Sequence, residues 1–136
     1  MAKDIRDKLK PTARGDSQPP KPQFFEMKLQ PAAYDKIRAG TKVIELRLYD
    51  EKRQLISLGD HITFFRQPSP GESMTVQVVA LLRYPSFSAM ISDFPCAWFG
   101  GSSRKELLAE LRQYYSKEDE KRYGIVGIKV QRVEKT

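Results

Sequence analysis

The chain has 136 residues, of which 40% are hydrophobic, and this suits a single domain with a buried core. Its net charge of +7 permits a polyanionic partner such as RNA but does not require one. No apolar run approaches the roughly 20 residues that span a bilayer, so we expect no membrane contact and a cytoplasmic protein. A single cysteine and a single histidine exclude an internal disulfide and disfavour zinc, so we predict no metal and no cofactor.

Residues 1–23 differ in composition from the rest of the chain. They hold four of the nine prolines, six Lys or Arg and three Asp, and they carry +3 of the net charge. A stretch with so few residues that can pack is expected to be a disordered, basic, proline-rich tail, followed by the domain at 24–136. The tail is either an arm that adds affinity for nucleic acid or simply a solvated extension.

The first half of the domain begins with a predicted strand over 24–29, because alternate apolar side chains there share one face. Pro31 fits the first turn of a helix that continues over 32–39 and ends at Gly40. A second strand is predicted over 42–49. A charged turn follows it.

The second predicted strand has charged side chains among apolar neighbours. Glu45 and Arg47 have the same parity, so they point to the same face. Lys42 has the other parity and joins them only if Thr41 and Lys42 are still loop, or if the chain bulges there. The three charges form either a functional cluster or a structural pair on a solvated face.

The second half of the chain alternates strands and short helices. Ser103 and Glu106 form a capping box that predicts a helix, and Ser116 with Asp119 forms a second one. The expected elements are strands over 61–66, 74–84 and 125–130, a hairpin turn over 68–72, and helices over 87–92, 104–115 and 117–122. Five or six strands joined partly by hairpins, with three or four helices, indicate an α+β fold with a largely antiparallel, curved sheet.

The run Gly40-x-Lys42-x-x-Glu45-x-Arg47, placed between a short helix and a strand, resembles the signature of the ASCH domain family. The order and length of the elements over about 24–133 agree with that resemblance. It implies a PUA-like small open β-barrel with flanking helices. It also implies that the domain binds RNA or a modified nucleoside.

Under this hypothesis Arg47 binds a phosphate or a base edge, and Lys42 binds a phosphate. Glu45 accepts from a base amino group or holds Arg47 in place. A cleft framed by these side chains is therefore the predicted binding site for RNA or a nucleotide. Further residues predicted to extend this surface are Trp98, Arg66, Tyr84 and Ser102.

An enzyme is the alternative, because a lysine of depressed pKa beside a carboxylate can move protons, which makes Lys42 and Glu45 the candidate catalytic residues. One ASCH branch resembles amidohydrolases of acetylated cytidine, which use a lysine, a threonine nucleophile and a distant glutamate. Lys42 matches that set, but Glu45 replaces the threonine and 94–103 holds no acidic residue. A ribonuclease also stays open. So does a coactivator-like module with a protein partner, for which the sequence offers no specific support.

Overall fold

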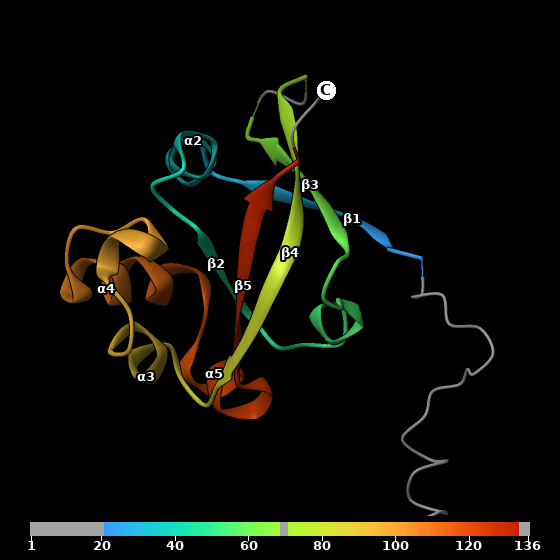
Figure 1. The fold of residues 1–136 in the computed structure, drawn as a ribbon. Coiled ribbons are helices and arrows are strands. Elements are labelled where there is room, and N and C mark those ends of the chain that lie inside the picture. The colour runs from blue at the N-terminus through green and yellow to red at the C-terminus, as the bar shows by residue number, and fades with distance from the viewer. Residues whose placement is uncertain (1–20, 69–70, 134–136) are drawn as a thin grey trace, which may run out of the picture.

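A computed structural model describes residues 21–68 and 71–133 (Figure 1). Within these ranges one five-stranded sheet is accompanied by four α-helices. The strands are β1 (Phe24–Leu29), β2 (Ile44–Leu48), β3 (His61–Arg66), β4 (Ser73–Tyr84) and β5 (Ile125–Arg132). The α-helices are α2 (Pro31–Ala39), α3 (Phe87–Ile91), α4 (Arg104–Tyr114) and α5 (Lys117–Tyr123), and the 3-10 turns are η2 (Arg53–Leu55) and η3 (Cys96–Phe99).

The sheet has the strand order β1-β3-β4-β5-β2, so β1 and β2 form its two edges. Only β1 and β3 are parallel, and every other pairing is antiparallel. The long strand β4 pairs with β3 in its first half and with β5 along most of its length, with a register irregularity between Val78 and Ala80. Such irregularities bend a strand. The result is a curled half-barrel of the α+β class, which confirms the predicted fold class.

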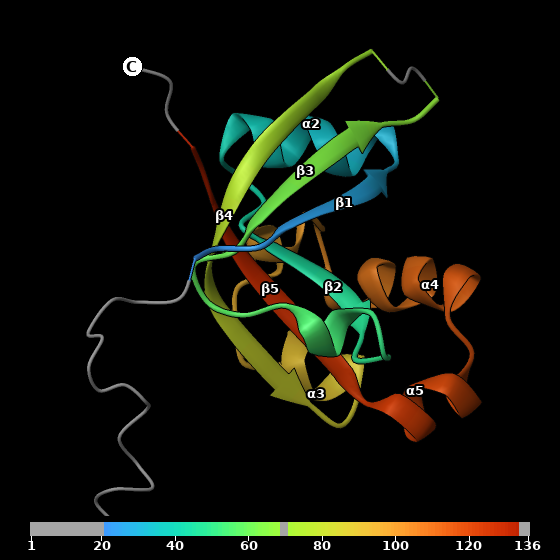
Figure 2. The ribbon, with the colours of Figure 1, turned by 90° about the vertical axis from the view of Figure 1, so that its right-hand side faces the viewer.

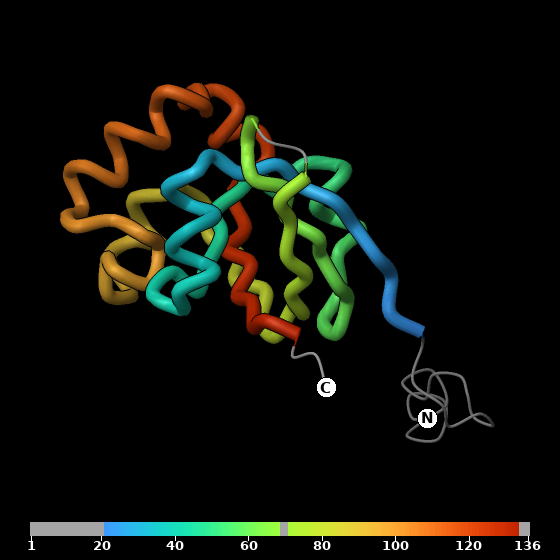
Figure 3. The backbone as a smooth tube through the Cα atoms, turned by 90° about the horizontal axis from the view of Figure 1, so that it is seen from above, coloured from blue at the N-terminus to red at the C-terminus, as the bar shows by residue number. Residues whose placement is uncertain are grey.

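Two apolar clusters fill the molecule. One lies inside the curl of the sheet and includes Ile62, Phe64, Val76 and the fully buried Tyr34 of α2. The other is formed by β2, β5 and the helices that follow β4, which Figure 2 shows gathered on one side of the sheet, away from α2. Seen from above, α2 and the orange part of the chain that contains α4 lie on the same side of the red strand β5 (Figure 3).

Strand β2 begins at Ile44, two residues later than predicted, because backbone groups just before it are already engaged. The amides of Thr41 and Lys42 both donate to the carbonyl of Lys36, and the amide of Val43 donates to that of Trp98. The predicted helix end at Gly40 is confirmed: φ is 87°, in the left-handed region that favours glycine.

The other predicted strands and helices are present, with shifts of a few residues at their ends, whereas the predicted turn over 68–72 includes residues 69 and 70, which lie outside the described residues. Ser103 caps α4 and Ser116 caps α5, each accepting from the backbone amide three residues on, as the capping boxes predicted. Most of the predicted tail, residues 1–20, lies outside the described residues. Gln23, placed in that tail, bonds to the domain through its amide and the carboxylate of Asp60 at 2.9 Å.

Candidate functional site

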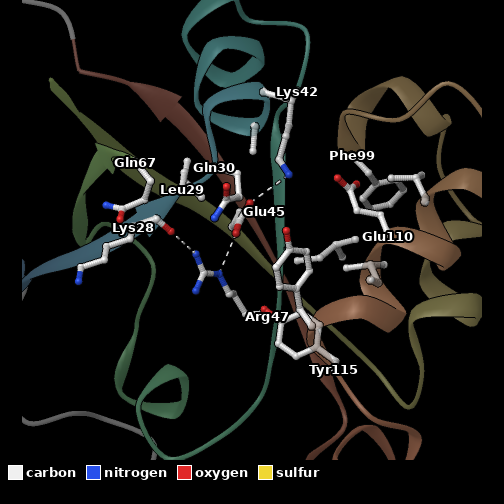
Figure 4. Close-up of a pocket in the computed structure, with 16 residues that line it drawn as sticks. Lys28, Leu29, Gln30, Lys42, Glu45, Arg47, Gln67, Phe99, Glu110 and Tyr115 are labelled. Atoms are coloured by element: carbon white, nitrogen blue, oxygen red, sulfur yellow. Dashed lines mark hydrogen bonds and ion pairs between the residues drawn. The ribbon is translucent and has the colours of Figure 1, made fainter. Parts of the chain in front are cut away.

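A buried charge cluster occupies the start of β2. The Glu45 carboxylate accepts from Lys42 Nζ at 3.0 Å on one oxygen and from Arg47 Nε at 2.7 Å on the other (Figure 4). The exposed fractions of the three side chains are 10% for Lys42, 8% for Glu45 and 16% for Arg47. Charged side chains are almost never this buried unless they are paired. We call these three residues the triad.

Lys42 reaches the triad because its backbone is still loop. The strand-like alternation begins only at Ile44, so the opposite parity of Lys42 does not turn its side chain away. Glu45 and Arg47, two residues apart within β2, share a face as predicted. One of the two conditions set by the sequence, a loop at Thr41 and Lys42, is therefore met.

Arg47 also links the two edges of the sheet. Its Nη2 donates to the backbone carbonyl of Lys28 on β1 at 3.0 Å, although β1 and β2 are not paired with each other. Figure 4 shows this bond beside the ion pair to Glu45. The triad therefore lies between β1 and β2, the two edge strands that the curled sheet leaves unpaired.

A cavity of about 330 Å³ opens over the triad. This lies at the low end of the roughly 300–1,000 Å³ that small-ligand sites occupy. Its apolar walls come from β1, α2, β2, η3 and α4, and the side chains of Lys28, Gln30 and Gln67 add polar groups. The apolar residues include Leu29, Ala33, Leu46, Phe99, Leu107 and Leu111. Tyr114 and Tyr115, at the end of α4, add two aromatic rings.

The opposite charges within the triad stabilise one another. Burial raises the pKa of the Glu45 carboxyl, but the cationic groups of Lys42 and Arg47 outweigh burial, and the pKa lies below its ordinary value. Burial lowers the pKa of the Arg47 guanidinium, but the charge and hydrogen bond of Glu45, together with Tyr115 and Asp50, outweigh burial, so the pKa lies above its ordinary value. Glu45 is thus ionised at neutral pH and is a weak general base.

The triad offers hydrogen-bond donors to the cavity. An ammonium has three N–H donors and a guanidinium has five. Among the described residues Lys42 uses one of them, for Glu45, and Arg47 uses two, for Glu45 and Lys28. Both Glu45 oxygens already accept from a cation, so the floor of the cavity mainly donates.

Gly100, at the end of η3, fits closely against Lys42. Its φ is 88°, and a Cβ there would lie 2.9 Å from Lys42 Cδ. We therefore expect Gly100→Ala to lower the free energy of unfolding by about 1–2 kcal/mol, from backbone strain and displacement of Lys42. Urea denaturation measures this, with Gly71→Ala as the control, because a Cβ at Gly71 meets nothing within 4 Å. An equal, small effect in both variants would contradict the prediction.

The structure does not bring the other predicted residues to the cavity. Arg66 pairs with Asp35 at 3.0 Å, and the Tyr84 hydroxyl donates to Asp93 at 2.7 Å. Ser102 donates to Glu106 on the first turn of α4.

Trp98 is closer to the triad, but its ring is not part of the cavity lining. Its carbonyl accepts from the amide of Val43. Trp98 as a residue is 38% exposed, and its ring stacks on Phe94 at 5.9 Å between centroids and has Lys129 Nζ 5.3 Å from its centre. Trp98 therefore holds the loop that carries Lys42 rather than lining the cavity.

The prediction from sequence missed Glu110, an acidic residue that lines the cavity from α4. The periodicity of α4 indicates the position of Glu110. Leu107, Glu110, Leu111 and Tyr114 have the spacing i, i+3, i+4 and i+7, which places them on one helix face. The buried leucine stripe of α4 thus indicates where Glu110 points.

Within residues 21–68 and 71–133, no three or more His, Cys, Asp or Glu side chains are grouped so that they could hold a metal ion. In the same ranges, no helix has both the length and the apolar character needed to cross a membrane.

Comparison with known proteins gives a protein family and solved structures that this chain resembles. The family model for the ASCH domain matches residues 27–134. The crystal structure of the hypothetical protein PH0355 is 37% identical with a TM-score of 0.73, covering 82% of this chain and 100% of that one. The solution structure of protein PF0455 from Pyrococcus furiosus is 36% identical with a TM-score of 0.68, covering 83% and 100%. No curated protein gives a significant match.

Proposed function

The chain belongs to the ASCH domain family, and we propose that it binds RNA or a nucleotide by taking one base into the cavity over the triad. The family supports a domain of a generic RNA-binding type. The observation that carries the finer proposal is the buried bridge from Lys42 through Glu45 to Arg47, which stands in a cavity of small-ligand size. The proposed binding requires no metal or cofactor.

The chemistry of the cavity suits a base better than a bare anion. Apolar and aromatic walls favour a flat ring, since every base has a π-face that stacks on aromatic side chains. The donors of Lys42 and Arg47 suit the acceptor atoms of a base edge. The net charge of +7 would speed encounter with the phosphate backbone and make the affinity depend on salt.

Arg47→Ala is expected to weaken binding of single-stranded RNA by about ten- to a hundredfold, because it removes donors from the cavity floor. Arg66→Ala is the matched control: it removes the same charge from a residue outside the cavity. Fluorescence anisotropy with labelled RNA at fixed salt measures both affinities. Equal losses in the two variants would mean that charge alone matters and would contradict the proposal.

Folding has to be checked in the same experiment, because Arg47 is also part of the triad. Circular dichroism identifies a variant that has unfolded. Arg47→Lys then replaces Arg47→Ala, since a lysine keeps the charge but loses the planar fork of donors. Lys42→Ala, compared with the exposed Lys52→Ala, tests the other cation in the same way.

Catalysis by the triad is the rival function, as a ribonuclease or an amidohydrolase with Lys42 and Glu45 in proton transfer. The lowered pKa of Glu45 weighs against it, because a carboxylate held by two cations is a weak base. A gel run on the same RNA tests this rival directly. Metal-independent cleavage that disappears in Lys42→Ala would replace our proposal, and absence of RNA binding even at low salt would favour a protein partner.

A further inference from the structure

We propose that Glu110 selects the base in the cavity and that the preferred base is guanine. This inference rests on the proposed function, since it assumes that a base enters the cavity. It concerns a residue outside the ASCH signature motif. It follows from the positions of donors and acceptors around the cavity.

Glu110 is the cavity's second carboxylate, and it stands on the wall opposite the triad. It projects from α4, whereas Lys42 and Glu45 come from β2 and the loop before it (Figure 4). The wall next to it is formed by Leu107 and Leu111, on the same helix face. A ring inserted between the two sides would meet Lys42 and Arg47 on one side and Glu110 on the other.

The two carboxylates differ in what they can accept. Both oxygens of Glu45 are held by charged donors at 3.0 and 2.7 Å. Glu110, in contrast, makes no hydrogen bond and no ion pair with any side chain in the described part of the chain. An ionised carboxylate can accept two parallel N–H bonds, so Glu110 is the anionic acceptor available to a ligand, beside the neutral amides of Gln30 and Gln67 that also line the cavity.

This arrangement matches the edge of guanine. Along this edge of guanine the O6 acceptor stands at one end and the N2–H donor at the other, with N1–H between them. A base held edge-on between the two walls therefore turns O6 toward the cations and its N–H groups toward Glu110. Arg and Lys are the residues that most commonly donate to O6 in specific contacts. Uracil offers the same carbonyl with one N–H. Adenine presents an amino donor where the cations need an acceptor, and cytosine does the same.

Short RNA oligonucleotides that differ only in their central base test this selection. We would measure the affinity of pentaribonucleotides whose central base is guanine, hypoxanthine, adenine or cytosine, flanked by adenosines. The guanine oligonucleotide is expected to bind about tenfold more tightly than the adenine one. Hypoxanthine keeps O6 and N1–H but lacks the 2-amino group, so its oligonucleotide is expected to have an intermediate affinity.

Glu110→Gln assigns the preference to this residue. The variant is expected to bind the guanine and hypoxanthine oligonucleotides about equally, while its affinity for the adenine oligonucleotide stays within about twofold of the unaltered protein. Glu118→Gln removes an exposed carboxylate from α5 and is the matched control. Because Glu110 is exposed and unpaired by other described side chains, the substitution should leave the fold unchanged.

The outcomes separate this inference from the proposed function. Binding without a preference for guanine, or a preference that survives in Glu110→Gln, would overturn the inference and leave RNA binding intact. No binding of any oligonucleotide at low salt would overturn both. A gain of affinity for all oligonucleotides in Glu110→Gln would show that Glu110 merely repels phosphate, which also overturns the selection of guanine.

Discussion

Replacement of Glu45 with glutamine is expected to lower the free energy of unfolding by about 3–5 kcal/mol. Glutamine has nearly the same shape, so the substitution removes the charge without creating a cavity. It leaves Lys42 and Arg47, with exposed side-chain fractions of only 10% and 16%, without the carboxylate that both contact. Removing one partner of a buried ion pair costs this much because the remaining charge stays desolvated. Urea denaturation followed by circular dichroism measures the loss.

The matched control is Asp35→Asn, which makes the same acid-to-amide change in an exposed pair. Asp35 accepts two bonds from Arg66, at 3.0 and 3.2 Å, on the surface of the molecule. Exposed pairs contribute little because water screens them. If the two substitutions changed the free energy of unfolding equally, the burial of the triad would not be the source of its stability.

The effect of Glu45 should also depend on pH, and the sign follows from its pKa. The pKa of Glu45 in the folded protein lies below its ordinary value of 4.5. Its contribution is therefore fully present above that value and is lost as pH falls through the lower, folded pKa. The stability difference between the unaltered protein and Glu45→Gln is expected to stay constant above about pH 5.5 and to shrink below about pH 4.5.

Most elements of the fold could be predicted from local patterns, whereas their partners could not. Alternating apolar residues, two capping boxes and Gly40 indicated the strands and helices. The parallel pairing of β1 with β3 and the placement of β2 at the far edge depend on contacts between distant segments. No local pattern encodes these contacts. The β2 start was wrong for the same reason, since the carbonyl that engages Val43 belongs to Trp98.

The candidate site was predictable in part. The parity of Glu45 and Arg47, and the condition under which Lys42 joins them, followed from strand geometry alone. The bond from Arg47 to the Lys28 carbonyl could not be predicted, because it needs the two sheet edges to meet. Glu110 was overlooked for a different reason. Helical spacing places Glu110 on the same face as Leu107 and Leu111, but only the placement of α4 near β1 and β2 makes that face a cavity wall.

Glu120→Ala is expected to lower the free energy of unfolding by about 2–3 kcal/mol and to weaken RNA binding as well. One oxygen of this buried carboxylate accepts from the amide of Phe87 at 2.6 Å, and the other from Arg112 at 2.9 Å. Without Glu120, the amide of Phe87 stays buried and unsatisfied. Arg112 in turn donates to the carbonyl of Tyr115 at 3.2 Å. Without Glu120, Arg112 is no longer held in place, and Tyr115, which lines the cavity, loses this support.

Glu118→Ala on the same helix provides the comparison. Glu118 is exposed in the first turn of α5, and its loss should cost only the favourable interaction with the helix dipole, about 0.3–1 kcal/mol. RNA affinity is to be measured at a temperature where both variants are fully folded, so that stability and binding are read separately. If folded Glu120→Ala binds RNA more weakly and folded Glu118→Ala does not, the contacts from Glu120 through Arg112 to the carbonyl of Tyr115 keep the cavity in its binding shape. Unchanged affinity would mean that the triad binds RNA without support from these contacts.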